Sequence, residues 1–267
     1  MTSLACLLTI PAVMWLTQGI LLRMHGLPLR WRIDARDAPR SVRIVGRVVT
    51  QAAVLGVLLG FPLLKGVSPA AYYGSYLPAG PAAWQAGQGL AAAVLALSLL
   101  FLAWVAAGRI RVELHQSRRK WRRRLLLLLP TAACGAFVEE LLFRGVLMAD
   151  LLAAWPRAPW AAAAVAAVVF AAAHYVRAVK RRWTFPGHLV LGLLLSLAFL
   201  RTGTLWLPIG LHAGGILMIM GTRPFFEYRG PVWLTGASIF PFAGVVGILG
   251  LGVLAAWVMT SFGAGGG

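Results

Sequence analysis

Long runs of apolar residues alternate with short polar stretches along the whole chain. A run of about 20 apolar residues forms a helix that can cross a membrane, because each residue adds about 1.5 Å to a hydrocarbon core about 30 Å thick. The pattern predicts about eight such helices. Their expected ranges are 3–22, 46–64, 86–108, 125–155, 159–177, 187–200, 204–221 and 240–262. The run 187–200 is shorter than a full span.

The composition supports a membrane protein. Charged residues make up 12% of the chain and the mean hydropathy is +0.80, whereas soluble domains carry about 25% charged residues. No repeat, low-complexity linker or polar domain interrupts the apolar runs. Cys6 and Cys134 both lie in apolar runs, so they predict no disulfide framework. We therefore expect an all-α polytopic helical bundle that forms one membrane domain over residues 1–267.

The net charge of +18 is concentrated in alternate loops. The basic residues of these loops lie within 23–47, 109–124, 177–182 and 223–229. Cytoplasmic loops carry the excess of Lys and Arg, so both termini are expected outside a membrane that we take to be the bacterial inner (plasma) membrane. The first run has no basic segment before it and no cleavage site before Arg23, which favours a retained helix over a signal peptide. Topology and attraction to anionic membrane lipids account for the charge, so no nucleic acid partner is expected.

Two acids and one arginine stand in the fourth apolar run, in the stretch FVEELLFRG (137–145). Ionisable residues inside a membrane usually face the bundle interior and mark a site. Glu140 and Arg144 are spaced i, i+4 on one helix face, which predicts an ion pair. Glu139 points about 100° away from Glu140 and has no cation nearby on its helix. A desolvated carboxylate of this kind suits general base catalysis.

Two further apolar runs each contain a histidine that could join this site. His174 ends the stretch VVFAAAH, and His212 lies among Gly210, Gly214 and Gly215, which permit close helix packing. His188 follows the turn KRRWTFPG and is expected at the membrane interface, and Asp150 is expected at the outer rim as a capping residue. Glu139, His174 and His212 can meet only if the bundle is built around them.

The residues alone leave other interpretations open. The same side chains could form a buried network that joins helices, or the proton or ion site of a small transporter, although no inverted repeat supports transport. Glutamate and histidine can also bind zinc, but the close ligand spacing typical of zinc sites is absent from the sequence. We therefore expect neither a metal nor another cofactor.

Three motifs in order resemble a known family. They are E-E-x-x-x-R, then F-x-x-x-H, then L-W-x-x-I-x-x-H, and together they resemble the CPBP family of intramembrane glutamic proteases, also called the Abi or type II CAAX prenyl endopeptidase family. The matching residues are Glu139, Glu140, Arg144, Phe170, His174, Leu205, Trp206, Ile209 and His212. The resemblance places a catalytic core at about 125–221.

The resemblance also implies a role for each motif residue. Glu139 would activate a water molecule and His174 would orient it, while Glu140 and Arg144 would hold the motif helix in place. His212 would help to stabilise the oxyanion of the tetrahedral intermediate. The family pattern usually continues with Asn or Asp at the fourth position after this histidine, where the chain has Ile216.

These observations predict an intramembrane glutamic endopeptidase that cleaves a membrane-associated protein or peptide. Some family members similar at the third motif are linked to C-terminal processing of sorted proteins, which makes such processing the expected activity. A prenylated substrate is less expected, because nothing in the sequence points to an organism with prenylated proteins. The alternative is a catalytically silent family member that acts as an immunity or scaffold protein, which Ile216 favours. The sequence does not specify an oligomeric state.

Overall fold

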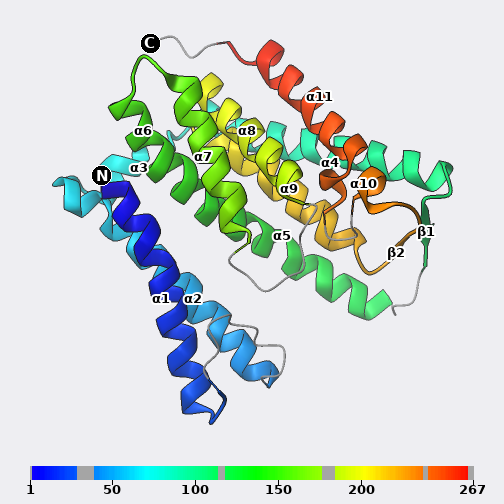
Figure 1. Cartoon of the computed structure of the whole chain (residues 1–267), viewed down its shortest axis with the longest axis horizontal. Helices are drawn as coiled ribbons and strands as arrows, with labels where there is room; N and C mark the ends of the chain where they lie inside the picture. Colours follow the sequence, from blue (N-terminus) through cyan, green and yellow to red (C-terminus); the bar gives the residue numbers. More distant parts are fainter. Residues whose placement is uncertain (1, 29–38, 114–117, 176–183, 237–239, 264–267) are drawn as a thin grey trace.

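Helices build almost all of the structure, a computed structural model that describes residues 2–28, 39–113, 118–175, 184–236 and 240–263. The helices are α1 (Thr2–Met24), α2 (Arg40–Gly60), α3 (Pro69–Gly74), α4 (Trp84–Ala106), α5 (Arg118–Glu140), α6 (Ala149–Ala154), α7 (Pro159–Ala173), α8 (Phe185–Thr202), α9 (Trp206–Thr222), α10 (Val232–Thr235) and α11 (Val245–Ser261). Short 3-10 turns lie at η2 (Pro62–Lys65), η3 (Pro81–Ala83) and η5 (Pro241–Ala243). Two short strands, β1 (Ile110–Val112) and β2 (Phe226–Tyr228), pair antiparallel. In Figure 1, α1 and α2 lie side by side and project from a bundle that contains the other long helices.

The predicted all-α membrane bundle is confirmed, and the protein is an integral membrane protein. Within the described residues, five helical spans are long and apolar enough to cross a membrane: Ala5–Met24, Ile44–Lys65, Trp84–Ala106, Leu126–Ala154 and Phe185–Thr202. The other three predicted runs form shorter apolar helices, namely α7, α9 and α11. The helix at the shortest predicted run is longer than expected, because α8 extends beyond 187–200 at both ends. Part of the predicted run 159–177 lies outside the described residues.

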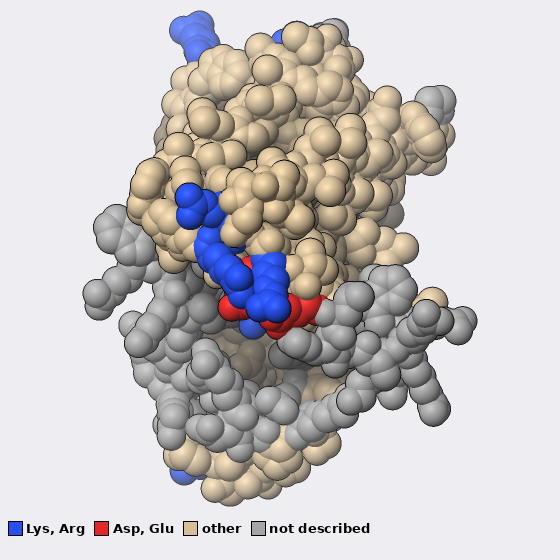
Figure 2. Space-filling view, turned by 90° about the vertical axis from the view of Figure 1, so that its right-hand side faces the viewer, with Lys and Arg blue, Asp and Glu red and all other residues tan. Residues whose placement is uncertain are grey.

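Polar contacts join chain segments at two ends of the bundle. At one end, Asp150 contacts Lys65 and accepts a hydrogen bond from the Ser3 backbone at 3.1 Å. The C-terminal end of α11 lies at this same end in Figure 1. At the other end, β1 and β2 join the loops that follow α4 and α9, with Arg111 opposite Glu227. Acidic and basic side chains lie next to one another on the face shown in Figure 2. Two ion pairs, each between residues two positions apart in one segment, are Arg111–Glu113 at 3.6 Å and Arg229–Glu227 at 3.3 Å.

Glycine allows α9 to pack closely against α4. A Cβ on Gly214 would lie 2.7 Å from the Leu90 carbonyl oxygen, and one on Gly210 would lie 2.1 Å from the Ala86 carbonyl oxygen. Small residues at helix contacts let backbones approach in a membrane bundle, so these glycines set the position of α9 and of His212. The close approach expected from the glycines is therefore present at Gly210 and Gly214, whereas a Cβ on Gly215 would meet nothing within 4 Å.

The fourth apolar run changes its helical geometry at the two acids. It is α-helical up to Glu140, continues as the π-helical segment η4 (Leu141–Met148) and becomes α-helical again in α6. A π segment leaves some carbonyl groups outside the regular α-helical ladder and is frequent at functional sites. The Gly145 carbonyl in this segment accepts a hydrogen bond from the Tyr72 hydroxyl at 2.8 Å. Burial raises the pKa of the Tyr72 phenol, so the phenol keeps its proton and remains a donor.

Candidate functional site

The two neighbouring acids lie well inside the membrane span. Glu139 is 13 residues beyond the start of the span Leu126–Ala154, which places it about 20 Å along the helix. The Glu139 side chain is 39% exposed, whereas the Glu140 side chain is fully buried. Consecutive residues of a helix point about 100° apart, so the two carboxylates enter different surroundings, as expected from their adjacent positions.

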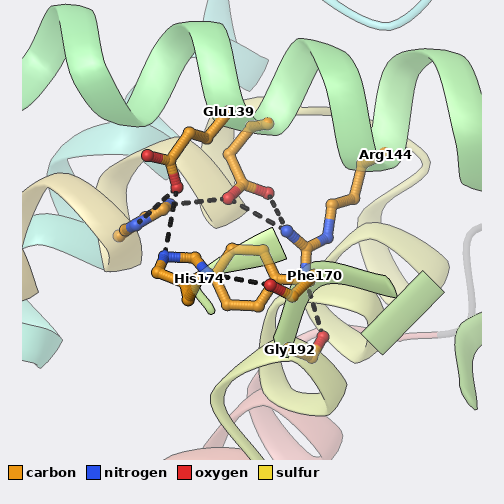
Figure 3. A network of polar contacts seen from close by, with 7 residues as sticks. Glu139, Arg144, Phe170, His174 and Gly192 are labelled. Atoms are coloured by element: carbon orange, nitrogen blue, oxygen red, sulfur yellow. Dashed lines mark hydrogen bonds and ion pairs between the residues drawn. The ribbon is translucent and has the colours of Figure 1, made fainter. Parts of the chain in front are cut away.

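Glu140 and Arg144 form the expected buried ion pair (Figure 3). One terminal nitrogen of Arg144 lies 3.1 Å from both oxygens of Glu140. The other terminal nitrogen donates to the Gly192 carbonyl of α8 at 2.8 Å, and the guanidinium carbon lies 4.9 Å from the centre of the Phe170 ring. A buried charge is tolerated when it is paired and hydrogen-bonded. Arg144 therefore ties the motif helix to both α7 and α8.

His174 caps the C-terminal end of α7 and turns toward Glu139. Its Nδ1 lies 2.8 Å from the Phe170 carbonyl oxygen. A carbonyl only accepts hydrogen bonds, so Nδ1 carries a proton, and the Nε2 of the neutral ring is an acceptor. This Nε2 lies 3.7 Å from Oε2 of Glu139. The distance exceeds a direct hydrogen bond and is one at which a bridging water has to be considered.

His212 contacts both acids. Its Nδ1 lies 2.7 Å from Oε1 of Glu140 and its Nε2 lies 3.7 Å from Oε2 of Glu139. The sequence predicted the approach of His212 to Glu139, but it assigned Glu140 to Arg144 alone. The additional contact links the buried ion pair to the more exposed acid through one imidazole. All five predicted site residues thus come together, from three separate apolar helical runs.

The burial of His188 was not predicted. The sequence placed His188 at the membrane interface and not in the site, and its side chain is buried with only 1% exposure. The His188 ring lies 4.6 Å from the His174 ring, and its Nδ1 donates to the Thr184 carbonyl oxygen at 2.8 Å. The only signal in the sequence is a histidine in the first turns of a helix, because its burial depends on packing against α7 and the segment around η5. Asp150 does lie at the rim, where it joins α6 to Lys65 and the start of α1.

A cavity of about 210 Å³ lies beside the site. Its polar lining consists of His174, His188 and His212, and the remainder is apolar or glycine. The helices α4, α8, α9 and α11 supply most of its wall. Ile216 lines this cavity, so the position where the family usually has Asn or Asp is apolar here and faces open space next to His212. An engineered apolar cavity of about 150 Å³ holds a benzene molecule, so the space suffices for an apolar group of that size.

The arrangement is suited to acid–base chemistry on water. Oε2 of Glu139 lies 3.7 Å from Nε2 of both His174 and His212. The Nδ1 atom of each ring is held by an acceptor, the Phe170 carbonyl or the Glu140 carboxylate. Within the described part of the chain, no three His, Cys, Asp or Glu side chains are grouped as ligands for a metal ion.

Comparison with known proteins gives one match. Residues 121–218 match the family model described as type II CAAX prenyl endopeptidase Rce1-like. No curated protein and no solved structure matches the chain. The matched residues contain all three motifs and the five site residues. The part of the chain that forms the site is therefore similar to the type II CAAX prenyl endopeptidase Rce1-like family, as the three motifs predicted.

Proposed function

We propose that the protein is an intramembrane glutamic endopeptidase that hydrolyses a peptide bond of a membrane-associated protein. The family match supports a membrane protease of the CAAX type. The observation that carries the mechanism is the position of Glu139, whose Oε2 lies 3.7 Å from the Nε2 atoms of both His174 and His212. We place the catalytic core at residues 125–221 within a single membrane domain.

Glu139 and His174 together hold the attacking water in this mechanism. Both present acceptors, Oε2 and Nε2, so one water molecule can donate a proton to each. Its lone pair then faces the carbonyl carbon of the substrate. As the water oxygen forms a bond to that carbon, its proton passes to Glu139, which acts as the general base.

His212 stabilises the tetrahedral intermediate. In its protonated form the ring donates from Nδ1 to Glu140 and from Nε2 toward the substrate oxyanion. A fixed donor aimed at developing negative charge in a dry site contributes about 3–4 kcal/mol to transition-state stabilisation. Collapse of the intermediate breaks the C–N bond, and Glu139 returns its proton to the leaving amine. The products are a carboxylate and an amine, with one water consumed.

The substrate class follows from the surroundings of the site. Glu139 lies within an apolar span and the neighbouring cavity is lined mainly by apolar side chains. We propose that the substrate is an apolar C-terminal or juxtamembrane segment, and that its natural reaction is C-terminal processing of sorted proteins. The enzyme would act in the bacterial inner membrane with its basic loops in the cytoplasm.

Two experiments test this proposal. In cells, mass spectrometry of protein termini compares the wild type with Glu139→Gln and His174→Ala, and membrane proteins that keep an unprocessed terminus only in the variants are substrates. In proteoliposomes, two internally quenched peptides ending in Cys-aliphatic-aliphatic-Met are compared, one S-farnesylated and one unmodified. Cleavage of either that depends on Glu139 supports the proposal. Processing that is unchanged in both variants argues against it.

One observation favours a second candidate, a catalytically silent protein that binds a partner in the membrane. Ile216 can neither donate a hydrogen bond nor orient a neighbour, although it lies in the cavity wall four residues after His212. This candidate predicts that Glu139→Gln retains the biological effect of the wild type and that neither peptide is cleaved. The contacts of His212 with both acids favour the protease, because they supply a donor without a polar residue at 216.

A further inference from the structure

A third histidine, His188, lies beside His174 and lines the same cavity. The His188 and His174 ring centroids are 4.6 Å apart, with an angle of 38° between the ring planes. Each ring has its Nδ1 held at 2.8 Å by the carbonyl oxygen of the residue four positions earlier, Phe170 or Thr184. The two histidine rings are therefore oriented by the same type of hydrogen bond, and they contact each other through their ring surfaces.

Two aromatic residues of the C-terminal segment hold the His188 ring. The centroids of the Phe240 and Phe242 rings lie 4.9 Å and 5.2 Å from it, both edge-on. The backbone is also tightly packed here, because a Cβ on Gly187 would lie 2.5 Å from the Cα of Ala243. This fixes the start of α8 against η5. Phe240 and Phe242 lie beyond the residues 121–218 that match the family model.

The direction of the His174 ring decides whether its Nε2 faces Glu139. Rotation of an imidazole about its last side-chain bond has broad energy minima, so the surrounding contacts set its angle. The ring touches Phe170 at 4.6 Å and His188 at 4.6 Å between centroids. Loss of the His188 ring removes one of these two ring contacts and leaves the hydrogen bond of Nδ1 to the Phe170 carbonyl.

We propose that His188 is a positioning residue for the proteolytic reaction, and that it couples the packing of the 240–242 segment to the orientation of His174. This inference rests on the proposed function above. His188 does not act on the substrate itself. It acts through its ring surface, which keeps Nε2 of His174 directed at the water that Glu139 activates.

The test compares two substitutions of one residue in proteoliposomes, with whichever of the two quenched peptides the wild type cleaves faster. His188→Ala removes the ring, and His188→Phe keeps a ring of similar shape without its nitrogens. We expect His188→Ala to lower kcat about 10- to 100-fold with KM within about 2-fold, because misplacement of a reacting group by about 1 Å has effects of this size. We expect His188→Phe to stay within about 3-fold of the wild-type kcat, since it preserves the ring contact. Leu193→Ala, at an exposed position of the same helix, is the matched control and should retain the wild-type kcat.

Phe242→Leu tests the coupling from the 240–242 segment, and it also serves if His188→Ala does not fold. It leaves all three histidines in place and should lower kcat without changing KM. The inference is overturned if His188→Ala keeps the wild-type kcat, if both His188 variants are equally inactive, or if Phe242→Leu folds and leaves kcat unchanged. These outcomes differ from failure of the proposed function, in which the wild type and Glu139→Gln do not differ in cleavage.

Discussion

The Glu140–Arg144 ion pair permits a quantitative prediction about stability. Arg144→Ala removes a fully buried guanidinium that contacts both oxygens of Glu140 at 3.1 Å and the Gly192 carbonyl at 2.8 Å. Glu140 then keeps its hydrogen bond to His212 but loses the cation, in a site with no exposure to solvent. Removal of one partner from a buried pair typically costs about 3–5 kcal/mol. For a chain of this size each kcal/mol lowers the unfolding temperature by about 2–4 °C, so we expect a fall of roughly 10 °C.

The assay is thermal unfolding of the purified protein in one detergent. Arg157→Ala, which removes an exposed arginine, is the control and should shift stability by less than about 0.5 kcal/mol. The double variant Glu140→Gln with Arg144→Met should be more stable than Arg144→Ala, because it leaves no unpaired buried charge. An unfolding temperature of Arg144→Ala equal to that of the wild type would refute the buried pair as a source of stability.

Two further predictions concern packing around the site. Tyr72→Phe removes the hydrogen bond to the Gly145 carbonyl and should destabilise the protein by about 0.5–1.5 kcal/mol, as measured by thermal unfolding; no change would mean that this bond does not stabilise the π segment. Gly214→Ala places a Cβ 2.7 Å from a backbone oxygen of α4 and should destabilise by about 1–3 kcal/mol, whereas Gly215→Ala meets nothing within 4 Å and should not. Equal unfolding temperatures for these two glycine variants would contradict the close contact of α4 and α9.

Much of the fold could be predicted because the apolar runs must satisfy their backbone groups internally in a membrane. Within the described residues, each predicted run contains an apolar helix. The lengths of the helices were less predictable. Helix α8 is longer than its apolar run because Phe185 and Pro186 begin it before the strongly apolar part, and Thr202 ends it before the left-handed Gly203.

The site residues could be predicted because charge and imidazole are rare in these runs. The i, i+4 spacing on one helix face was enough to predict the Glu140–Arg144 pair. The contact between Glu140 and His212 could not be found in this way, because it depends on how α5 and α9 are rotated against each other. The burial of His188 could not be predicted for the same reason. Its burial depends on Phe240 and Phe242, which are more than 50 residues further along the chain.

The central claim is that the carboxylate of Glu139 activates the attacking water. The most direct measurement is the kcat of purified wild type and Glu139→Gln on the better-cleaved peptide, with unfolding temperatures recorded to show that both are folded. Glutamine preserves the size of the side chain but cannot accept the proton, and general base catalysis contributes about 10²–10⁴-fold to rate. We expect a kcat lower by at least about 100-fold in a variant as stable as the wild type. Equal rates of cleavage by the two proteins would contradict it.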